Sequence, residues 1–136
     1  MNIKRIIHIG IYAADMDPVK KLYTDILGLS VSEEEVYEGH TDICFLPVGD
    51  SQLELCASIY PDGEVAQLVA EQGEGIDHIA FEVDDLEKET EELLKKGFKA
   101  ISGGKFVAGG GFAYFDTDKV GGVQIELFQT PPGISI

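Results

Sequence analysis

The chain has 136 residues, 44% of them hydrophobic, which suits one globular domain or two small fused modules. Its 25 acidic and 10 basic residues give a formal charge of −15, which excludes a nucleic-acid partner because no basic surface offsets phosphate repulsion. No apolar run reaches membrane-spanning length and no signal pattern opens the chain, so we expect a soluble cytoplasmic protein with no membrane partner.

The first half of the chain is expected to form a strand, a helix and three further strands. Residues 3–12 alternate like a strand, and the apolar residues from Val19 to Leu27 have the spacing of an amphipathic helix. Asp15 or Asp17 can cap this helix, and Gly28 ends it. Three strand-like runs follow, over residues 29–37, 41–48 and 52–59. A connecting stretch, about residues 61–73, carries a short helical pattern.

The second half repeats this order. A strand precedes a helix marked by Leu86 and Leu93 and ended by Gly97, and later strands are expected at residues 98–101, 112–115 and 122–128. Module one covers about residues 1–60 and module two about 74–130. We therefore predict an α+β fold in which two tandem β-α-β-β-β modules form a single domain over residues 1–136.

Glycines are concentrated between the last strands of module two, at Gly103, Gly104 and residues 109–111. They indicate a loop that either moves or approaches a ligand closely, with a plain flexible hairpin as an equal alternative. Cys44 and Cys56 lack the spacing of a thiolate metal site and are expected to be small buried residues in a reducing compartment.

Two histidines and two glutamates occupy matched positions in the modules. His8 and His78 lie in similar strands, Ile7-His8-Ile9-Gly10 and Asp77-His78-Ile79-Ala80, and Glu54 and Glu126 lie in the motifs Gln-Leu-Glu-Leu and Gln-Ile-Glu-Leu. Two imidazoles and two carboxylates make a suitable ligand set for a divalent metal ion. Taken singly, each is more often an ordinary polar residue on a solvated strand face.

Strand alternation places all four residues opposite the aliphatic side chains of their own strands. Helices are expected to cover the aliphatic face, and the other face of a curved, open cup-shaped sheet would then line a cavity around the metal.

These motifs resemble the vicinal oxygen chelate superfamily, whose paired β-α-β-β-β modules form a cup around a divalent metal. Within it the chain is most similar to the methylmalonyl-CoA epimerases, through His8-Ile9-Gly10-Ile11, the segment from Gly73 to Asp85, and Gly121-Gly122-Val123-Gln124-Ile125-Glu126-Leu127. The resemblance spans nearly the whole chain.

The resemblance implies metal ligands at His8, Glu54, His78 and Glu126, with cobalt or manganese favoured and nickel or zinc as alternatives. It also implies epimerisation of methylmalonyl-CoA by abstraction of the α proton, through a metal-stabilised enolate. Glu126 is the first candidate base, because a carboxylate beside a metal can accept a proton. The second base implied by the family matches Asp42, which we expect on the cavity face with Cys44. Tyr37 and His40 are the alternatives for that role.

Other activities stay open at this point. A glyoxalase I-like lactoylglutathione lyase would use a similar metal site, a non-catalytic ligand-binding protein would need none, and a ring-cleaving dioxygenase would use one carboxylate fewer. A small acyl-CoA is the expected partner, and by analogy the protein is expected to be a homodimer. The basic candidates for offsetting an anionic substrate are Lys4, Arg5, Lys20, Lys21 and Lys105.

Overall fold

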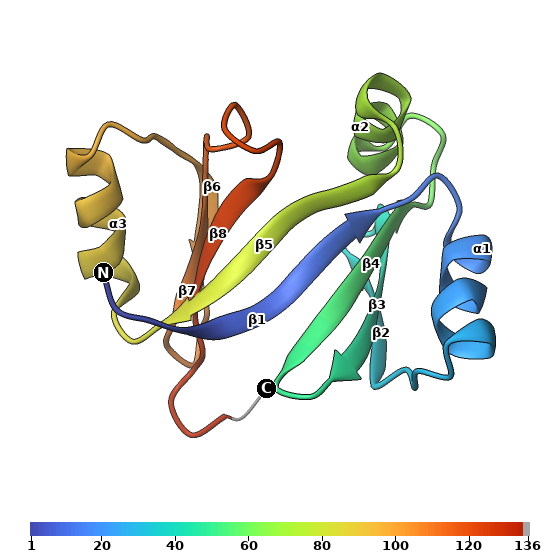
Figure 1. Ribbon diagram of the computed structural model, residues 1–136, viewed down its shortest axis with the longest axis horizontal. Helices are drawn as coiled ribbons and strands as arrows, with labels where there is room; N and C mark the ends of the chain where they lie inside the picture. The colour runs from blue at the N-terminus through green and yellow to red at the C-terminus, as the bar shows by residue number, and fades with distance from the viewer. Residues whose placement is uncertain (135–136) are drawn as a thin grey trace. The chain divides into compact units, whose positions relative to one another are not determined.

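The computed structural model describes residues 1–134 and confirms the α+β fold, with the predicted order of strands and helices found twice (Figure 1). The elements are β1 (Ile3–Tyr12), α1 (Met16–Lys21), a π-helical continuation η1 (Leu22–Ile26), β2 (Glu33–Tyr37), β3 (Thr41–Val48), β4 (Ser51–Ser58), α2 (Glu64–Gln72), β5 (Gly75–Val83), α3 (Leu86–Lys95), β6 (Ala100–Lys105), β7 (Gly111–Phe115) and β8 (Gln124–Gln129). Within residues 1–134, no helix is both long and apolar enough to cross a membrane.

Two compact units make up the chain. The middle unit consists of Ile9–Asp77, and the terminal unit consists of Met1–His8 together with the chain from His78 onward. Strand β1 is therefore shared, since its first half packs in the terminal unit and its second half in the middle unit. The single domain of two modules, about residues 1–60 and 74–130, stays a prediction.

The middle unit has the strand order β2-β3-β4-β1. Its core consists of Cys44, Leu46 and Leu55, and Met16 and Val19 of α1 pack against it. Residues 29–32 are not in a strand as predicted, because Leu29 packs on this core and its amide donates to the Tyr23 carbonyl at the end of the helix.

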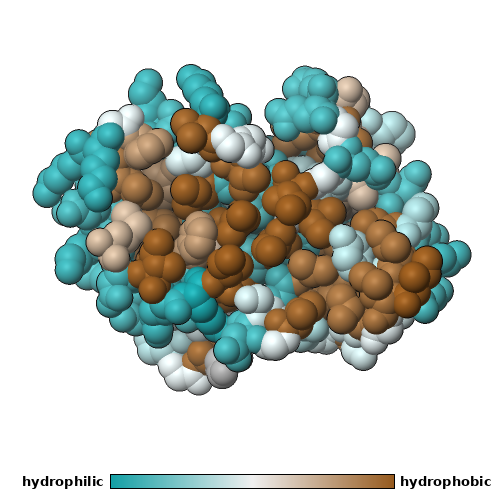
Figure 2. Space-filling model, viewed as in Figure 1, coloured by the Kyte–Doolittle hydropathy of each residue, from teal (hydrophilic) through white to brown (hydrophobic). Residues whose placement is uncertain are grey.

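The terminal unit has the strand order β1-β5-β8-β7-β6, with α3 against one face. Val83, Phe115 and Leu127 form its core, against which Leu86 and Leu93 of α3 pack. The Asp85 side chain caps α3 by accepting from the Lys88 amide at 3.2 Å. In Figure 2 the surface over α3 is hydrophilic, whereas hydrophobic residues gather over the strands of this unit.

An ion-pair network joins β1 to β5 inside the terminal unit. The Arg5 guanidinium donates to both carboxylate oxygens of Glu82, at 3.0 and 3.4 Å, and the Thr130 hydroxyl donates to Oε2. Burial would raise the pKa of Glu82, but the hydrogen bonds from Arg5 and Thr130 outweigh it and hold that pKa below its usual 4.5. The network therefore stabilises the strand pair that carries both histidines.

Replacing Arg5 with glutamine is expected to lower the free energy of unfolding by about 2 kcal/mol at pH 7, because it removes the cation hydrogen-bonded to the buried Glu82 carboxylate and leaves the more distant Lys4 ammonium, at 3.9 Å. The folded pKa of Glu82 is depressed, so this stabilisation is present above pH 4.5 and disappears as the pH falls through the folded value. Urea denaturation of both proteins between pH 7 and pH 3 measures the difference. A difference in the free energy of unfolding that stays constant down to pH 3 would contradict this explanation.

The glycine-rich segment is only partly a loop. Gly103 and Gly104 belong to β6, where they pair with Ala113 and Phe112, so their prediction as loop residues is wrong. The reason is close backbone packing, since a Cβ on Gly103 would lie 2.6 Å from the Phe112 carbonyl oxygen. Cys44 and Cys56 are buried, as predicted, and no disulfide joins them.

Candidate metal site

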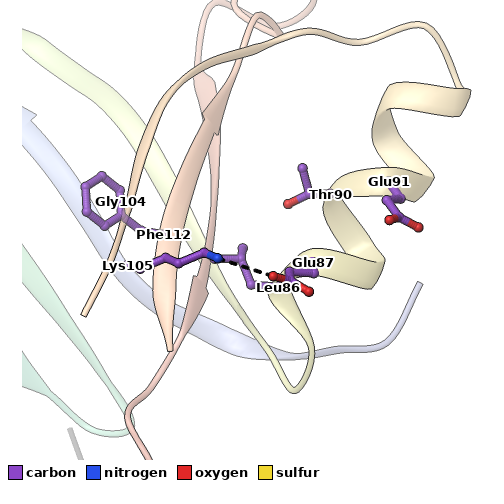
Figure 3. Close-up of a pocket in the computed structure, with 7 residues that line it drawn as sticks. All are labelled: Leu86, Glu87, Thr90, Glu91, Gly104, Lys105 and Phe112. Carbon is purple, nitrogen blue, oxygen red and sulfur yellow. Dashed lines mark hydrogen bonds and ion pairs between the residues drawn. The ribbon is translucent and has the colours of Figure 1, made fainter. Parts of the chain in front are cut away.

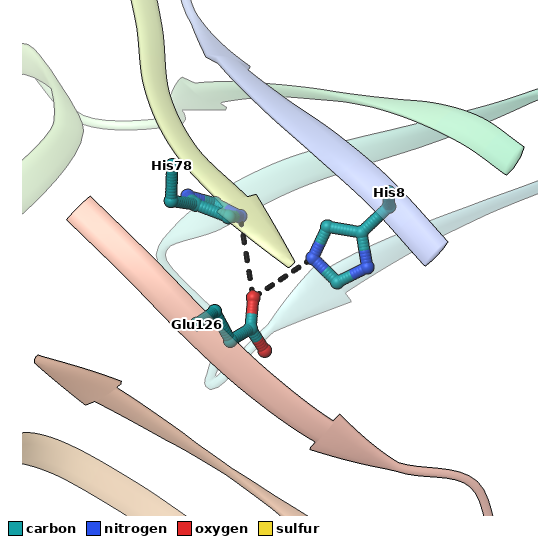
Figure 4. A group of neighbouring side chains, drawn as sticks. All are labelled: His8, His78 and Glu126. Carbon is teal, nitrogen blue, oxygen red and sulfur yellow. Dashed lines mark hydrogen bonds and ion pairs between the residues drawn. The ribbon is translucent and has the colours of Figure 1, made fainter. Parts of the chain in front are cut away.

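His8, His78 and Glu126 meet inside the terminal unit (Figure 4). The Nε2 of His8 lies within hydrogen-bond distance of Oε1 of Glu126, at 2.9 Å, and the Nε2 of His78 lies 3.6 Å from the same oxygen. The imidazole rings meet edge to face, with centroids 5.3 Å apart. All three side chains are at least 95% buried. Polar residues on a solvated strand face would be exposed, so that ordinary explanation does not hold for these three.

Strand alternation explains how three distant residues come together. In the parallel pairing of β5 with β8, Ala80 lies opposite Glu126, so the even-numbered residues of both strands share one face. The odd-numbered residues Val83 and Leu127 face α3 and form the core. The predicted opposition of polar and aliphatic faces is therefore confirmed in this unit.

The donor set fits a divalent cation. The three candidate ligand atoms lie within 4.8 Å of one another. Two ligands bound to one ion at about 2.0–2.2 Å lie roughly 3–4 Å apart, close to the separations found around Oε1. Two neutral imidazoles and one carboxylate match the preferences of borderline divalent metals and leave positions open for substrate oxygens.

The fourth predicted ligand, Glu54, belongs to the middle unit, where it lies on β4. The Cys56 thiol donates to its Oε1 at 3.7 Å. Burial, and after it the charge of Asp77, raises the pKa of Tyr12 in the same unit, so the tyrosine hydroxyl is protonated at neutral pH. The role of Glu54 as a ligand stays a prediction.

The expected position of Asp42 is wrong. In the antiparallel pairing of β3 with β4, Asp42 lies opposite Ala57 and Cys44 opposite Leu55, whereas Glu54 lies opposite Phe45. Asp42 and Cys44 therefore share the face that packs against α1, and Glu54 is on the other face. The prediction that Asp42 and Cys44 share one face of β3 was correct. Which face of β3 packs against the helix depends on the register of β3 with β4.

Sequence reasoning missed Tyr114 as a neighbour of the metal group. Its hydroxyl oxygen lies 3.5 Å from His78 Nε2, and the two rings meet edge to face at 5.1 Å. Tyr114 lies directly opposite Glu126 in the pairing of β7 with β8. The alternation Phe112-Ala113-Tyr114-Phe115 is the signal that could have placed this residue on the polar face.

A separate cleft lies between α3 and β6, on the helix side of the terminal unit (Figure 3). Thr90 and Glu91 line it from the helix, and the Lys105 ammonium pairs there with Glu87 at 3.4 Å. Three of the other four predicted anion partners are also paired with carboxylates: Lys4 with Asp84, Arg5 with Glu82 and Lys20 with Glu34. These cations already have acidic partners within the chain, so none of the four is an obvious substrate handle.

Comparisons with known proteins identify the family and the fold. The model of the Glyoxalase/Bleomycin resistance protein/Dioxygenase superfamily matches residues 7–115. The human mitochondrial methylmalonyl-CoA epimerase is 27% identical over 132 residues, covering 94% of this chain and 75% of that protein. The crystal structure of methylmalonyl-CoA epimerase from Mycobacterium tuberculosis superposes with a TM-score of 0.81 at 26% identity, covering 96% of this chain and 90% of the other. A methylmalonyl-CoA epimerase in complex with methylmalonyl-CoA and NH4+ gives 0.82 at 26% identity, covering 99% and 100%.

Proposed function

Because the chain belongs to the glyoxalase/bleomycin resistance protein/dioxygenase superfamily, we propose that it is a metal-dependent epimerase that interconverts the stereoisomers of methylmalonyl-CoA. The observation that carries this proposal is the buried group of His8, His78 and Glu126 on one sheet face. Two relatives that are 27% and 26% identical over nearly the whole chain are named methylmalonyl-CoA epimerases. We keep cobalt or manganese as the favoured metal, and a small acyl-CoA as the substrate.

His8, His78 and Glu126 would hold the ion, with Glu54 as the fourth ligand. A bound divalent cation would polarise the thioester carbonyl and stabilise negative charge that develops on its oxygen. The residues around it exclude water, since the three side chains are almost fully buried and the Tyr114 ring packs on His78. A site of this kind increases the acidity of a carbon beside a thioester carbonyl.

Glu126 is the proposed base. Both of its contacts with histidine use Oε1, which makes Oε2 the oxygen we assign to the proton (Figure 4). The carboxylate takes the proton from the carbon between thioester and carboxylate, and the C–H electron pair moves into the carbonyl group to give the enolate. Return of a proton to the opposite side of that carbon inverts it and restores the thioester.

The proton for the opposite side needs a second donor. Asp42 is not assigned to this role, because it lies on the α1 face of the middle unit rather than on the face of Glu54. The homodimer and the cytoplasmic location that the sequence suggested are kept as predictions.

Exchange of the α proton in deuterated water, followed by NMR with methylmalonyl-CoA, tests the function. The metal-loaded protein is expected to exchange the proton, and protein stripped with a chelator is expected to lose exchange and regain it when cobalt or manganese is restored. The hemithioacetal of methylglyoxal and glutathione serves as the competing substrate.

Turnover of the hemithioacetal without exchange of methylmalonyl-CoA would assign the chain to the glyoxalase I-like lyases. Ligand binding that is unchanged after metal removal, with neither activity, would instead indicate a non-catalytic binding protein. Either result would overturn the proposal that the protein is an epimerase.

A further inference from the structure

Six aromatic rings form a closed circuit beside the candidate metal site. Neighbouring ring centroids are 5.9 Å apart for His8 and Phe128, 5.4 Å for Phe128 and Phe106, 6.0 Å for Phe106 and Phe112, 5.8 Å for Phe112 and Tyr114, 5.1 Å for Tyr114 and His78, and 5.3 Å for His78 and His8. We call the four members that are not histidines the aromatic wall: Phe106, Phe112, Tyr114 and Phe128. Each of them is half-buried, so each ring keeps some surface exposed.

Strand register places the aromatic wall on the same sheet face as the metal group. In the pairing of β7 with β8, Tyr114 lies opposite Glu126 and Phe112 lies opposite Phe128. Directly opposite residues in an antiparallel pair project to one side, away from the core that packs on α3. The wall therefore starts at the histidines and extends one residue pair further along the strands.

Phe106 lies at the end of the wall farthest from the histidines, in a turn held by two backbone hydrogen bonds. The Phe106 amide donates to the Gly110 carbonyl at 3.1 Å, and the Gly109 amide donates to the Phe106 carbonyl at 3.0 Å. Gly110 has φ 77° and packs so closely that a Cβ there would lie 2.2 Å from the Gln129 carbonyl oxygen. This turn fixes the Phe106 ring against Phe112 and Phe128 and leaves Val107 exposed at its tip.

The aromatic wall is apolar, and the metal group beside it is polar. The wall carries three phenyl rings and one phenol and no charged group, whereas the adjoining histidines and Glu126 suit a metal ion and, through it, substrate oxygens. A ligand that meets both surfaces has chelating oxygens at one end and a short apolar group at the other. The group must be short, because Phe106 ends the wall only one residue pair beyond Tyr114 and Glu126.

We propose that the aromatic wall is a binding subsite for the alkyl substituent on the α carbon of the substrate, and that Phe106 is a specificity-determining residue. This inference rests on the proposed function, because it uses an α-substituted acyl group whose oxygens bind at the metal site. The substrate class that follows is that of acyl groups with a short α-alkyl branch, rather than unbranched malonyl groups.

Calorimetric binding of free malonate, methylmalonate, ethylmalonate and propylmalonate to the cobalt-loaded protein tests the subsite without any turnover. In the wild-type protein each added methylene is expected to tighten binding about threefold to fourfold. In Phe106→Ala the gain per methylene is expected to fall by about half, while malonate affinity stays unchanged, because one of the rings that contact the alkyl group is removed. Phe106→Leu keeps an apolar side chain and is expected to restore most of the gain.

Val107→Ala is the matched control, because it shortens an exposed side chain in the same turn and is expected to leave the whole series unchanged. An equal or larger gain per methylene in Phe106→Ala would overturn the subsite, even if the α proton is exchanged. A gain that depends on Phe106, found together with no exchange of methylmalonyl-CoA, would support the subsite and overturn the epimerase. If not even malonate binds the loaded protein, both proposals are wrong.

Discussion

Glu126→Gln is expected to lower the rate of α-proton exchange by about a thousandfold, the middle of the range for loss of a general base. Glutamine has nearly the same shape, and its amide oxygen can still occupy the position of Oε1, 2.9 Å from His8 Nε2, and offer an oxygen ligand to the cobalt ion. It cannot take up the proton, so the loss is a loss of proton transfer. The measurement is deuterium incorporation at the α carbon of methylmalonyl-CoA, with cobalt bound to both proteins in equal amounts.

Asp42→Asn is the matched control for that experiment, since it also converts a carboxylate on a strand into an amide. Because Asp42 lies on the α1 face of the middle unit, exchange is expected to change by no more than about twofold. A loss with Asp42→Asn as large as that with Glu126→Gln would show that Asp42 reaches the substrate, as the family resemblance first suggested. Full activity of Glu126→Gln would remove Glu126 from the role of base.

His78→Gln is expected to weaken binding of cobalt by at least about a hundredfold, beyond the 10–100-fold typical of losing an outer-shell partner. His78 is 1% exposed and contributes one of three candidate ligand atoms, so its loss leaves two. Titration followed by the visible absorption of cobalt gives the affinity. Thermal unfolding gives an independent result, because a metal that binds only the folded protein raises its stability by about 2.7 kcal/mol at a hundred times the dissociation constant.

His40→Gln is the matched control for His78, because His40 lies outside the group and contacts the Thr41 hydroxyl at 2.7 Å. It is expected to bind cobalt like the wild-type protein. Glu54→Gln tests the fourth ligand in the same titration, and weaker binding is expected if Glu54 coordinates the ion. Equal cobalt affinity in His78→Gln and wild-type protein would overturn the metal site.

The sequence alone was enough for much of the fold and for the centre of the site. Alternation along β1, β5 and β8 separated His8, His78 and Glu126 from the aliphatic residues, and the structure brings these three together. The reason is that strand parity is a local property, fixed by the backbone of each strand whatever its neighbours are. Repetition of the same pattern in both halves identified the residues that matter among many acidic side chains.

What the tertiary structure decided depends on pairing between strands. The face on which Asp42 lies follows from its register opposite Ala57, and that register is set by the β3–β4 pairing rather than by β3 itself. The aromatic wall likewise arises because the turn at Gly110 returns Phe106 onto Phe112 and Phe128. The sharing of β1 between two units is also a matter of packing. Contacts between residues distant in sequence are determined by the burial of apolar faces, and no local pattern in the chain specifies their partners.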